Sequence, residues 1–190
     1  ECSMCHLEPA GQIKVRLRVE PASLFDDFLY TPGATYTFTA TLEGEHLGLG
    51  SPFANYNSLV VSFVDKDGFS TGNIGGFAAE DFYSGNPSTI ASAGLKPGVT
   101  EWSFEWTAGS PDFGPAHGPI TLHLAAVDGN GAESGPTGTL TDPFGDDVFT
   151  AKVELQEGGG GSKGAARTTP SRPGTVICAL IDAASAAAAT

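Results

Sequence analysis

Hydrophobic and polar residues alternate with a period of two along much of the first 155 residues. Because successive side chains of a β-strand point to opposite faces, this alternation predicts strands with one buried face. The segment IKVRLRVE (13–20) shows the pattern most clearly, with apolar residues at Ile13, Val15, Leu17 and Val19. The same alternation occurs in TPGATYTFTATLEG (31–44), EWSFEWTAG (101–109), GPITLHLAAVDGNG (118–131) and DDVFTAKVELQE (146–157).

Two further segments complete the predicted set of strands. NSLVVSFVDKDG (57–68) is more uniformly apolar, as in a central strand, and ends in a turn at Asp67-Gly68. A weaker strand is expected around Ile74–Phe82, and helical periodicity is almost absent. About seven short alternating strands separated by turn signals are typical of an immunoglobulin-like antiparallel β-sandwich. We therefore expect an all-β fold, with likeness to antibody domains in architecture only, because their Cys-Trp-Cys arrangement is missing from the sequence.

The composition changes after residue 157. Residues 158–174 are rich in glycine and proline, which is typical of a flexible linker. Residues 175–190 form a short apolar segment that contains the β-prone octamer TVICALID. Two interpretations stay open: a disordered tail, or an extra strand added to an open sheet edge of its own domain or of a neighbouring copy. The sequence thus divides into a leader (1–12), a sandwich (13–157), a linker (158–174) and an apolar segment (175–190).

Charge narrows the set of partners. The chain has 190 residues with 22 acidic and 9 basic side chains, a net charge of −13. This balance disfavours nucleic acid and anionic membrane surfaces as partners, whereas a basic partner could be steered to the protein. No stretch of about 18 apolar residues occurs, so no membrane span is expected. No signal-peptide pattern precedes the sandwich; if the protein is exported, we expect Glu1 to lie near a mature N-terminus.

The leader contains the motif CSMCH, residues 2–6. Two cysteines in C-x-x-C spacing followed by histidine are what covalent haem attachment requires. We predict that Cys2 and Cys5 form thioether bonds to one haem c and that His6 is the proximal iron ligand. The alternative is a disulfide between Cys2 and Cys5 in an oxidising compartment. Structural zinc is disfavoured because no second pair of Cys or His ligands is present, and the pairing of Cys178 stays open.

A second axial ligand for the iron must come from another histidine. The only methionine, Met4, lies inside the attachment motif and cannot easily reach the opposite face of the ring. His46 is preferred, because the loop after the second strand of an antiparallel sandwich should lie beside the N-terminus. His117 is the alternative, in a loop at the opposite end, where it could serve a haem of an adjacent molecule. His123 is third, since it lies mid-strand. Apolar candidates for the wall of a haem pocket are Leu7, Leu47, Leu49 and Phe53.

Calcium is the second cofactor considered. The segments DKDG and DGNG offer hard oxygen ligands, but neither matches the twelve-residue EF-hand pattern, and plain turn chemistry is the alternative interpretation. The candidate ligands are Asp65, Asp67, Asp128, Asn130, Asp142, Asp146 and Asp147. Motifs of serine hydrolases, zinc proteases and P-loop enzymes do not occur in the sequence, so we do not expect an enzyme.

Several segments together resemble a known family. They are the CxxCH leader, YTPGATYTFTATLEG, WSFEWTAG, AAVDGNG and GDDVFTAKVEL. This set resembles the reeler-like, "choice-of-anchor" domains of bacterial cell-surface proteins, over roughly residues 1–155. The resemblance implies an immunoglobulin-like sandwich and an exported protein, either extracellular at the cell surface or periplasmic. The C-terminal segment departs from the usual sorting signals of such proteins, because it has no apolar helix followed by basic residues.

Two functional hypotheses follow. In the first, the chain is a mono-haem c-type cytochrome-like protein that exchanges electrons with a redox partner protein or a neighbouring haem. In the second, it is a structural or adhesive surface module, such as a filament subunit, and the leader is a small disulfide loop. Both allow copies of the chain to assemble into a homopolymer through residues 175–190.

Overall fold

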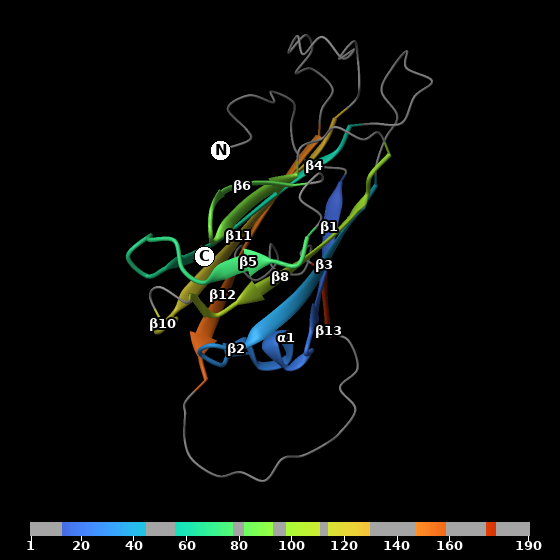
Figure 1. Cartoon of the computed structure of the whole chain (residues 1–190). Coiled ribbons are helices and arrows are strands. Elements are labelled where there is room, and N and C mark those ends of the chain that lie inside the picture. Colours follow the sequence, from blue (N-terminus) through green and yellow to red (C-terminus); the bar gives the residue numbers. More distant parts are fainter. Residues whose placement is uncertain are drawn as a thin grey trace, which may run out of the picture.

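The alternating segments form the strands of two packed sheets in the computed structural model (Figure 1). The structure describes residues 13–44, 56–77, 82–92, 98–110, 114–129, 147–158 and 174–177. The strands of the first sheet, in spatial order, are β13 (Gly174–Ile177), β1 (Lys14–Glu20), β3 (Thr35–Glu43), β8 (Glu101–Thr107) and β5 (Asn73–Gly75). The neighbours within this sheet are antiparallel.

The second sheet is mixed. Its strands, in spatial order, are β2 (Leu29–Tyr30), β12 (Asp147–Glu157), β11 (Ile120–Asp128), β4 (Ser58–Asp65), β7 (Thr89–Ser92) and β6 (Phe82–Asn86). Only the short β2 pairs in parallel, with the end of β12. Two two-residue strands, β9 (Gly109–Ser110) and β10 (Gly114–Pro115), form a small ribbon. A one-turn helix, α1 (Ser23–Asp27), joins β1 to β2.

Burial follows the predicted alternation. In β1, the side chains of Val15, Leu17 and Val19 are at most 1% exposed, whereas the basic residues between them point outward. The strands β3, β8 and β11 show the same two-residue period of burial. These segments form strands because that period lets every apolar side chain reach the space between the two sheets. The all-β sandwich expected from the sequence is confirmed.

Aromatic rings join the two sheets. Trp106 of β8 in the first sheet stacks on Phe63 of β4 in the second, with ring centroids 4.3 Å apart and an interplanar angle of 6°. Within the first sheet, Phe38 stacks on Phe104 at 5.2 Å. All four rings are fully buried. Burial of large rings dominates core energetics, so this cluster makes the sandwich a stable support for its loops.

The structure departs from the prediction at residues 74–82 and at α1. The single weak strand expected around residues 74–82 is two strands in different sheets, β5 and β6, because the intervening Gly76 has φ +67°, which a strand does not adopt. The helix α1 was not expected, since five residues are too few to show helical periodicity. The octamer TVICALID contributes β13, which pairs with β1 of its own domain. Within the described ranges, no helix is long and apolar enough to cross a membrane.

Candidate functional site

One end of the sandwich receives the leader. The backbone N–H of Ile13 donates a hydrogen bond of 3.0 Å to Oδ2 of Asp147, a carboxylate only 4% exposed. Lys14 lies opposite Glu43 in the β1–β3 register, and Asp128 lies opposite Asp147 in the β11–β12 register. We call this the leader end, defined by Ile13, Glu43, Asp128 and Asp147. The point where the leader joins the sandwich therefore lies beside the point where the loop carrying His46 departs.

The predicted haem residues themselves lie outside the described residues. This holds for Cys2, Cys5, His6 and His46, for Cys178, and for the pocket-wall candidates Leu7, Leu47, Leu49 and Phe53. Haem attachment at CSMCH and ligation by His46 thus stay predictions. The structure shows only where the leader joins the sandwich, since Ile13 is held at the leader end.

His117 lies at the opposite end. Its Nδ1 is 3.3 Å from Oε1 of Glu157, and Oε2 of Glu157 accepts a 2.7 Å hydrogen bond from the N–H of Gly118. The hydroxyl of Tyr30 donates to the carbonyl oxygen of Gly118 at 2.6 Å. We call these four residues the foot cluster. The Gly118 N–H first, and then His117, holds the pKa of Glu157 below its usual value of 4.5.

The length of β11 separates the foot cluster from the leader end. Its nine residues run from Ile120 to Asp128 and span about 27 Å at the usual rise per residue. The chain from His6 to Ile13 reaches about 25 Å when fully extended. The two lengths are comparable, so ligation of a haem iron by His117, on its own leader or on an adjacent molecule, stays a prediction.

His123 lies in the middle of β11, between Ser62 of β4 and Lys152 of β12. Its side chain is half-buried on the outer face of the second sheet. Burial, and then the nearby charge of Lys152, lowers the pKa of His123 below 6.5. A neutral imidazole that packs into a sheet surface in this way is suited to a structural role.

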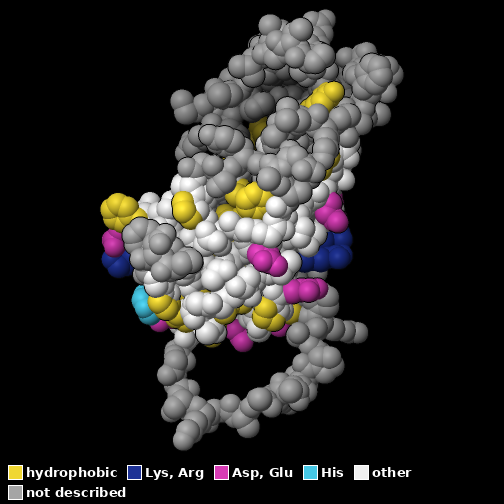
Figure 2. Space-filling model, in the orientation of Figure 1, with side chains coloured by type: hydrophobic (Ala, Val, Ile, Leu, Met, Phe, Trp, Pro, Cys, Tyr) yellow, Lys and Arg dark blue, Asp and Glu magenta, His cyan; other side chains and the backbone are white. Residues whose placement is uncertain are grey.

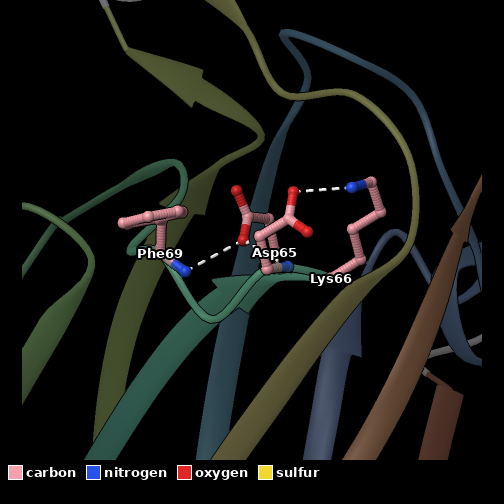
Figure 3. Close-up of polar contacts among 4 residues, drawn as sticks. Asp65, Lys66 and Phe69 are labelled. Atoms are coloured by element: carbon pink, nitrogen blue, oxygen red, sulfur yellow. Dashed lines mark hydrogen bonds and ion pairs between the residues drawn. The ribbon is translucent and has the colours of Figure 1, made fainter.

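The turn at Asp65 shows what the DKDG segment does. One oxygen, Oδ1 of Asp65, accepts hydrogen bonds of 2.9 Å from the N–H groups of both Asp67 and Phe69 (Figure 3). Lys66 pairs instead with the carboxylate of Asp67 at 2.6 Å. Gly68 completes the turn with φ +84°. This is Asx-turn chemistry, which an aspartate at the start of a turn favours.

The candidate calcium ligands are divided between the two ends. Asp65 lies opposite Ile120, near the foot cluster, whereas Asp128 and Asp147 lie at the leader end. Asn130, Asp142 and Asp146 lie outside the described residues. In the part of the chain that the structure describes, no group of three or more His, Cys, Asp or Glu could hold a metal ion. Calcium binding stays a prediction that the geometry does not test.

The outer face of the first sheet is sorted by charge. Outward positions on β1 are the basic residues Lys14, Arg16 and Arg18, followed by Glu20 at the end of the strand, and those on β3 are mainly threonines. Glu101 and Glu105 point outward from β8. Arg16 forms an ion pair with Glu43. Figure 2 shows basic and acidic side chains close together on this flank of the sandwich.

Sequence reasoning missed the foot cluster. Tyr30 and Glu157 are separated by more than a hundred residues, and no sequence motif contains both. The parallel pairing of β2 with the end of β12, which places Tyr30 opposite Glu157, brings them together. Only the sheet pairing carries this information, so no local signal could have found the cluster.

Comparison with known proteins shows a shared fold. No family model and no curated protein sequence matches the chain. Among solved structures, the Reelin-N domain of F-spondin is similar with a TM-score of 0.51 and 15% identity, over 83% of this chain and 95% of that domain. The human F-spondin reeler domain (fragment 2) matches with a TM-score of 0.44 and 16% identity, over 80% and 91% of the two chains. The sandwich described above is therefore reeler-like in fold.

Proposed function

We propose that this chain is a non-catalytic interaction module of the cell exterior, with a structural or adhesive role. The observation that carries the proposal is its likeness in fold to the Reelin-N domain of F-spondin, which extends over 95% of that domain. The sequence segments that resemble reeler-like domains of bacterial cell-surface proteins lend independent support. Together they favour the surface-module hypothesis over the cytochrome hypothesis.

The described residues suit such a role. The buried aromatic cluster gives a rigid body, and functional contacts in sandwiches are commonly made by loops and outer faces on such a scaffold. The outer face of the first sheet presents basic residues on β1 and acidic residues on β8 within one surface. Charged groups arranged in this way favour specific orientation of a partner more than raw affinity.

Labelling of intact cells tests the location. Lys14 and Lys66 are exposed, so a membrane-impermeant amine reagent should modify both in unbroken cells that produce the protein. Mass spectrometry of the isolated protein reads out the modified lysines, with a cytoplasmic protein as control. Modification only after lysis would contradict an exterior location.

Readdition to cells tests the contact role. The purified, fluorescently labelled chain should bind saturably to cells that lack it. The matched control is the Trp106→Ala variant, which removes a fully buried ring from the core and should destabilise the fold by about 3–5 kcal/mol. Equal binding by the parent chain and by this variant, at a temperature where only the variant is unfolded, would be non-specific and would contradict the proposal.

Covalent haem attachment is a second candidate function, and the CSMCH motif favours it. Haem c bound at Cys2, Cys5 and His6 would supply one-electron chemistry. The hydrogen bond from Ile13 to Asp147 would keep the group near the leader end.

The absorption spectrum and intact mass of the exported protein test this candidate. A sharp α-band after dithionite reduction, with a mass raised by one haem, is expected if the motif is used. The Cys2→Ser, Cys5→Ser double variant should lose both signals. A colourless protein whose mass is lower by two hydrogens would instead show one disulfide, and loss of this mass difference in the double variant but not in Cys178→Ser would assign it to Cys2 and Cys5.

A further inference from the structure

The edge strand of the first sheet comes from the far end of the chain. β13 pairs antiparallel with β1 over four positions, from Arg16↔Ile177 to Val19↔Gly174. On its other side, β1 pairs with β3 along all seven of its residues. The position and shape of β1 are therefore determined by β3, and β13 occupies an edge that is already formed.

β1 has the features of a strand built to stand at an edge. Its outward side chains include Lys14, Arg16 and Arg18, three of the nine basic residues of the chain. Charged outward residues, lysine above all, are common on edge strands because they discourage uncontrolled pairing with other chains. Such an edge accepts a strand through backbone hydrogen bonds, and the partner must supply a matching extended segment.

The tether to β13 has the length and composition to reach more than one edge. Sixteen residues, 158–173, connect Glu157 of β12 to β13, and five of them are glycine. A glycine-rich chain of this length has a root-mean-square span of about 20–24 Å. Fully extended it covers about 53–58 Å. A sandwich of this size has a radius of gyration of about 15 Å, so the edge of a neighbouring copy lies within reach.

Exchange of β13 between copies should change the free energy of strand pairing little. A strand that leaves its own β1 and pairs with β1 of another copy breaks and remakes the same backbone hydrogen bonds. Whether β13 pairs with its own β1 or with that of another copy then depends on protein concentration. A short flexible linker gives β13 an effective concentration of the order of 1 mM at its own β1. Copies crowded at one surface would approach this value, and exchange of an identical element is a low-cost route to assembly.

We propose that β13 is an exchangeable strand, and that the partner of the β1 edge in the assembled state is a second copy of this chain. The inference rests on the proposed function, since it names the partner of the surface module. Each copy then donates residues 174–177 and accepts those of its neighbour. A one-way arrangement of this kind extends into an open chain of copies, whereas a reciprocal one closes as a dimer.

Paired cysteines on separate molecules test the exchange. Arg18 and Thr175 are directly opposite in the β1–β13 register, and opposed residues lie close enough for a disulfide. In a full chain with Cys2, Cys5 and Cys178 replaced by serine, one preparation carries Arg18→Cys and the other carries Thr175→Cys. A disulfide between these two preparations requires β13 of one molecule to reach β1 of another.

The matched control replaces the Arg18→Cys chain with a Lys152→Cys chain. Lys152 is also an exposed basic residue in a strand, but it lies in the second sheet. At about 1 mM protein, we expect about tenfold more mixed disulfide for the Arg18 pair than for the control, since control pairs meet only by collision. Equal yields from the two mixtures would overturn the proposal.

A third preparation distinguishes a failure of the β13–β1 pairing itself from a failure of its exchange between copies. A single chain with both Arg18→Cys and Thr175→Cys should close an internal disulfide in dilute solution. Failure of this closure would overturn the β13–β1 pairing and the exchange with it. These measurements use purified protein, so their outcome is independent of the cell-labelling result, which decides the proposed function.

Discussion

At the residue scale, Trp106 is a fully buried side chain of the described core. Its ring contacts Phe63, Tyr36 and Tyr30, and its indole N–H donates to the carbonyl oxygen of Thr71 at 3.4 Å. Gly72 lies directly against the indole and has φ +80°. A side chain at this position would meet both the ring and the carbonyl oxygen of Thr107, the latter at 2.7 Å. The glycine is thus required by space as well as by backbone conformation.

The first prediction concerns Gly72. The Gly72→Ala variant should lower the free energy of unfolding by about 2–5 kcal/mol, because overpacking of about 1–3 kcal/mol adds to left-handed strain of about 1–2 kcal/mol. Gly68→Ala is the matched control, since Gly68 has φ +84° with nothing within 4 Å, and only the strain should appear. Urea denaturation measures both. Equal losses in the two variants would contradict the packing argument.

The second prediction concerns Tyr30. Burial first, and then the charge of Glu157 and the nearby Tyr36, raises the pKa of Tyr30 from 10.0 to about 12. The unfolded chain therefore ionises this phenol at lower pH than the folded chain does. The stabilisation from this group is complete below pH 10 and is lost as pH rises from 10 toward 12.

Thermal unfolding on either side of pH 10 measures this effect. The Tyr30→Phe variant should be less stable at neutral pH by about 1 kcal/mol, because it lacks the hydrogen bond to Gly118. Its stability should also fall less steeply with alkaline pH than that of the parent chain. Parallel alkaline profiles for the two proteins would contradict the assignment.

At the element scale, the end of β12 is held by its neighbours. The N–H of Gln156 donates to the carbonyl oxygen of Phe28, and the N–H of Gly158 donates to that of Tyr30. These bonds form where β2 pairs with the end of β12. Glu157 accepts from Gly118 at the turn that precedes β11. These contacts hold Gly158, the last described residue of the sandwich before the tether.

The third prediction concerns acid stability of this element. The pKa of Glu157 lies below 4.5, so its contribution to stability is present above pH 4.5 and is lost as pH falls through the lowered pKa. The Glu157→Gln variant should lack this part of the acid dependence in thermal unfolding. NMR titration should show that His117→Ala retains part of the lowering, since the Gly118 N–H is its first cause. Full recovery to 4.5 in His117→Ala would contradict that order of causes.

At the scale of the whole molecule, Asp147 links the first described residue to the last long strand. It accepts the Ile13 N–H across 134 positions of the sequence. The two ends of the sandwich are connected to different segments of the chain. The leader joins the sandwich at one end, and the tether to β13 departs from the other.

The fourth prediction tests this link. Asp147→Ala should speed hydrogen exchange at the Ile13 amide by about tenfold or more, because a hydrogen bond to a charged group contributes about 1.5–3 kcal/mol. Asp147→Asn keeps an acceptor oxygen and serves as the control, with a smaller change expected. Unchanged exchange in the alanine variant would show that the amide is protected by another contact.

The sequence alone was sufficient for the fold class and for most of the core. Alternation in IKVRLRVE and EWSFEWT is a local property, and it identifies the buried face of a strand without knowledge of its neighbours. The turn at Asp67-Gly68 was also visible, because its chemistry depends on adjacent residues. The haem motif is equally local. It stays a prediction, because residues 2–6 lie outside the described residues.

Only the tertiary structure decided what depends on contacts between distant segments. It divided residues 74–82 between two sheets and brought Tyr30 to Gly118 and Glu157. It also showed which strand receives the start of TVICALID within one chain, by pairing β13 with β1. A strand pattern specifies which face is buried, whereas its partner and register depend on the whole sheet, and that information is not present in any one segment.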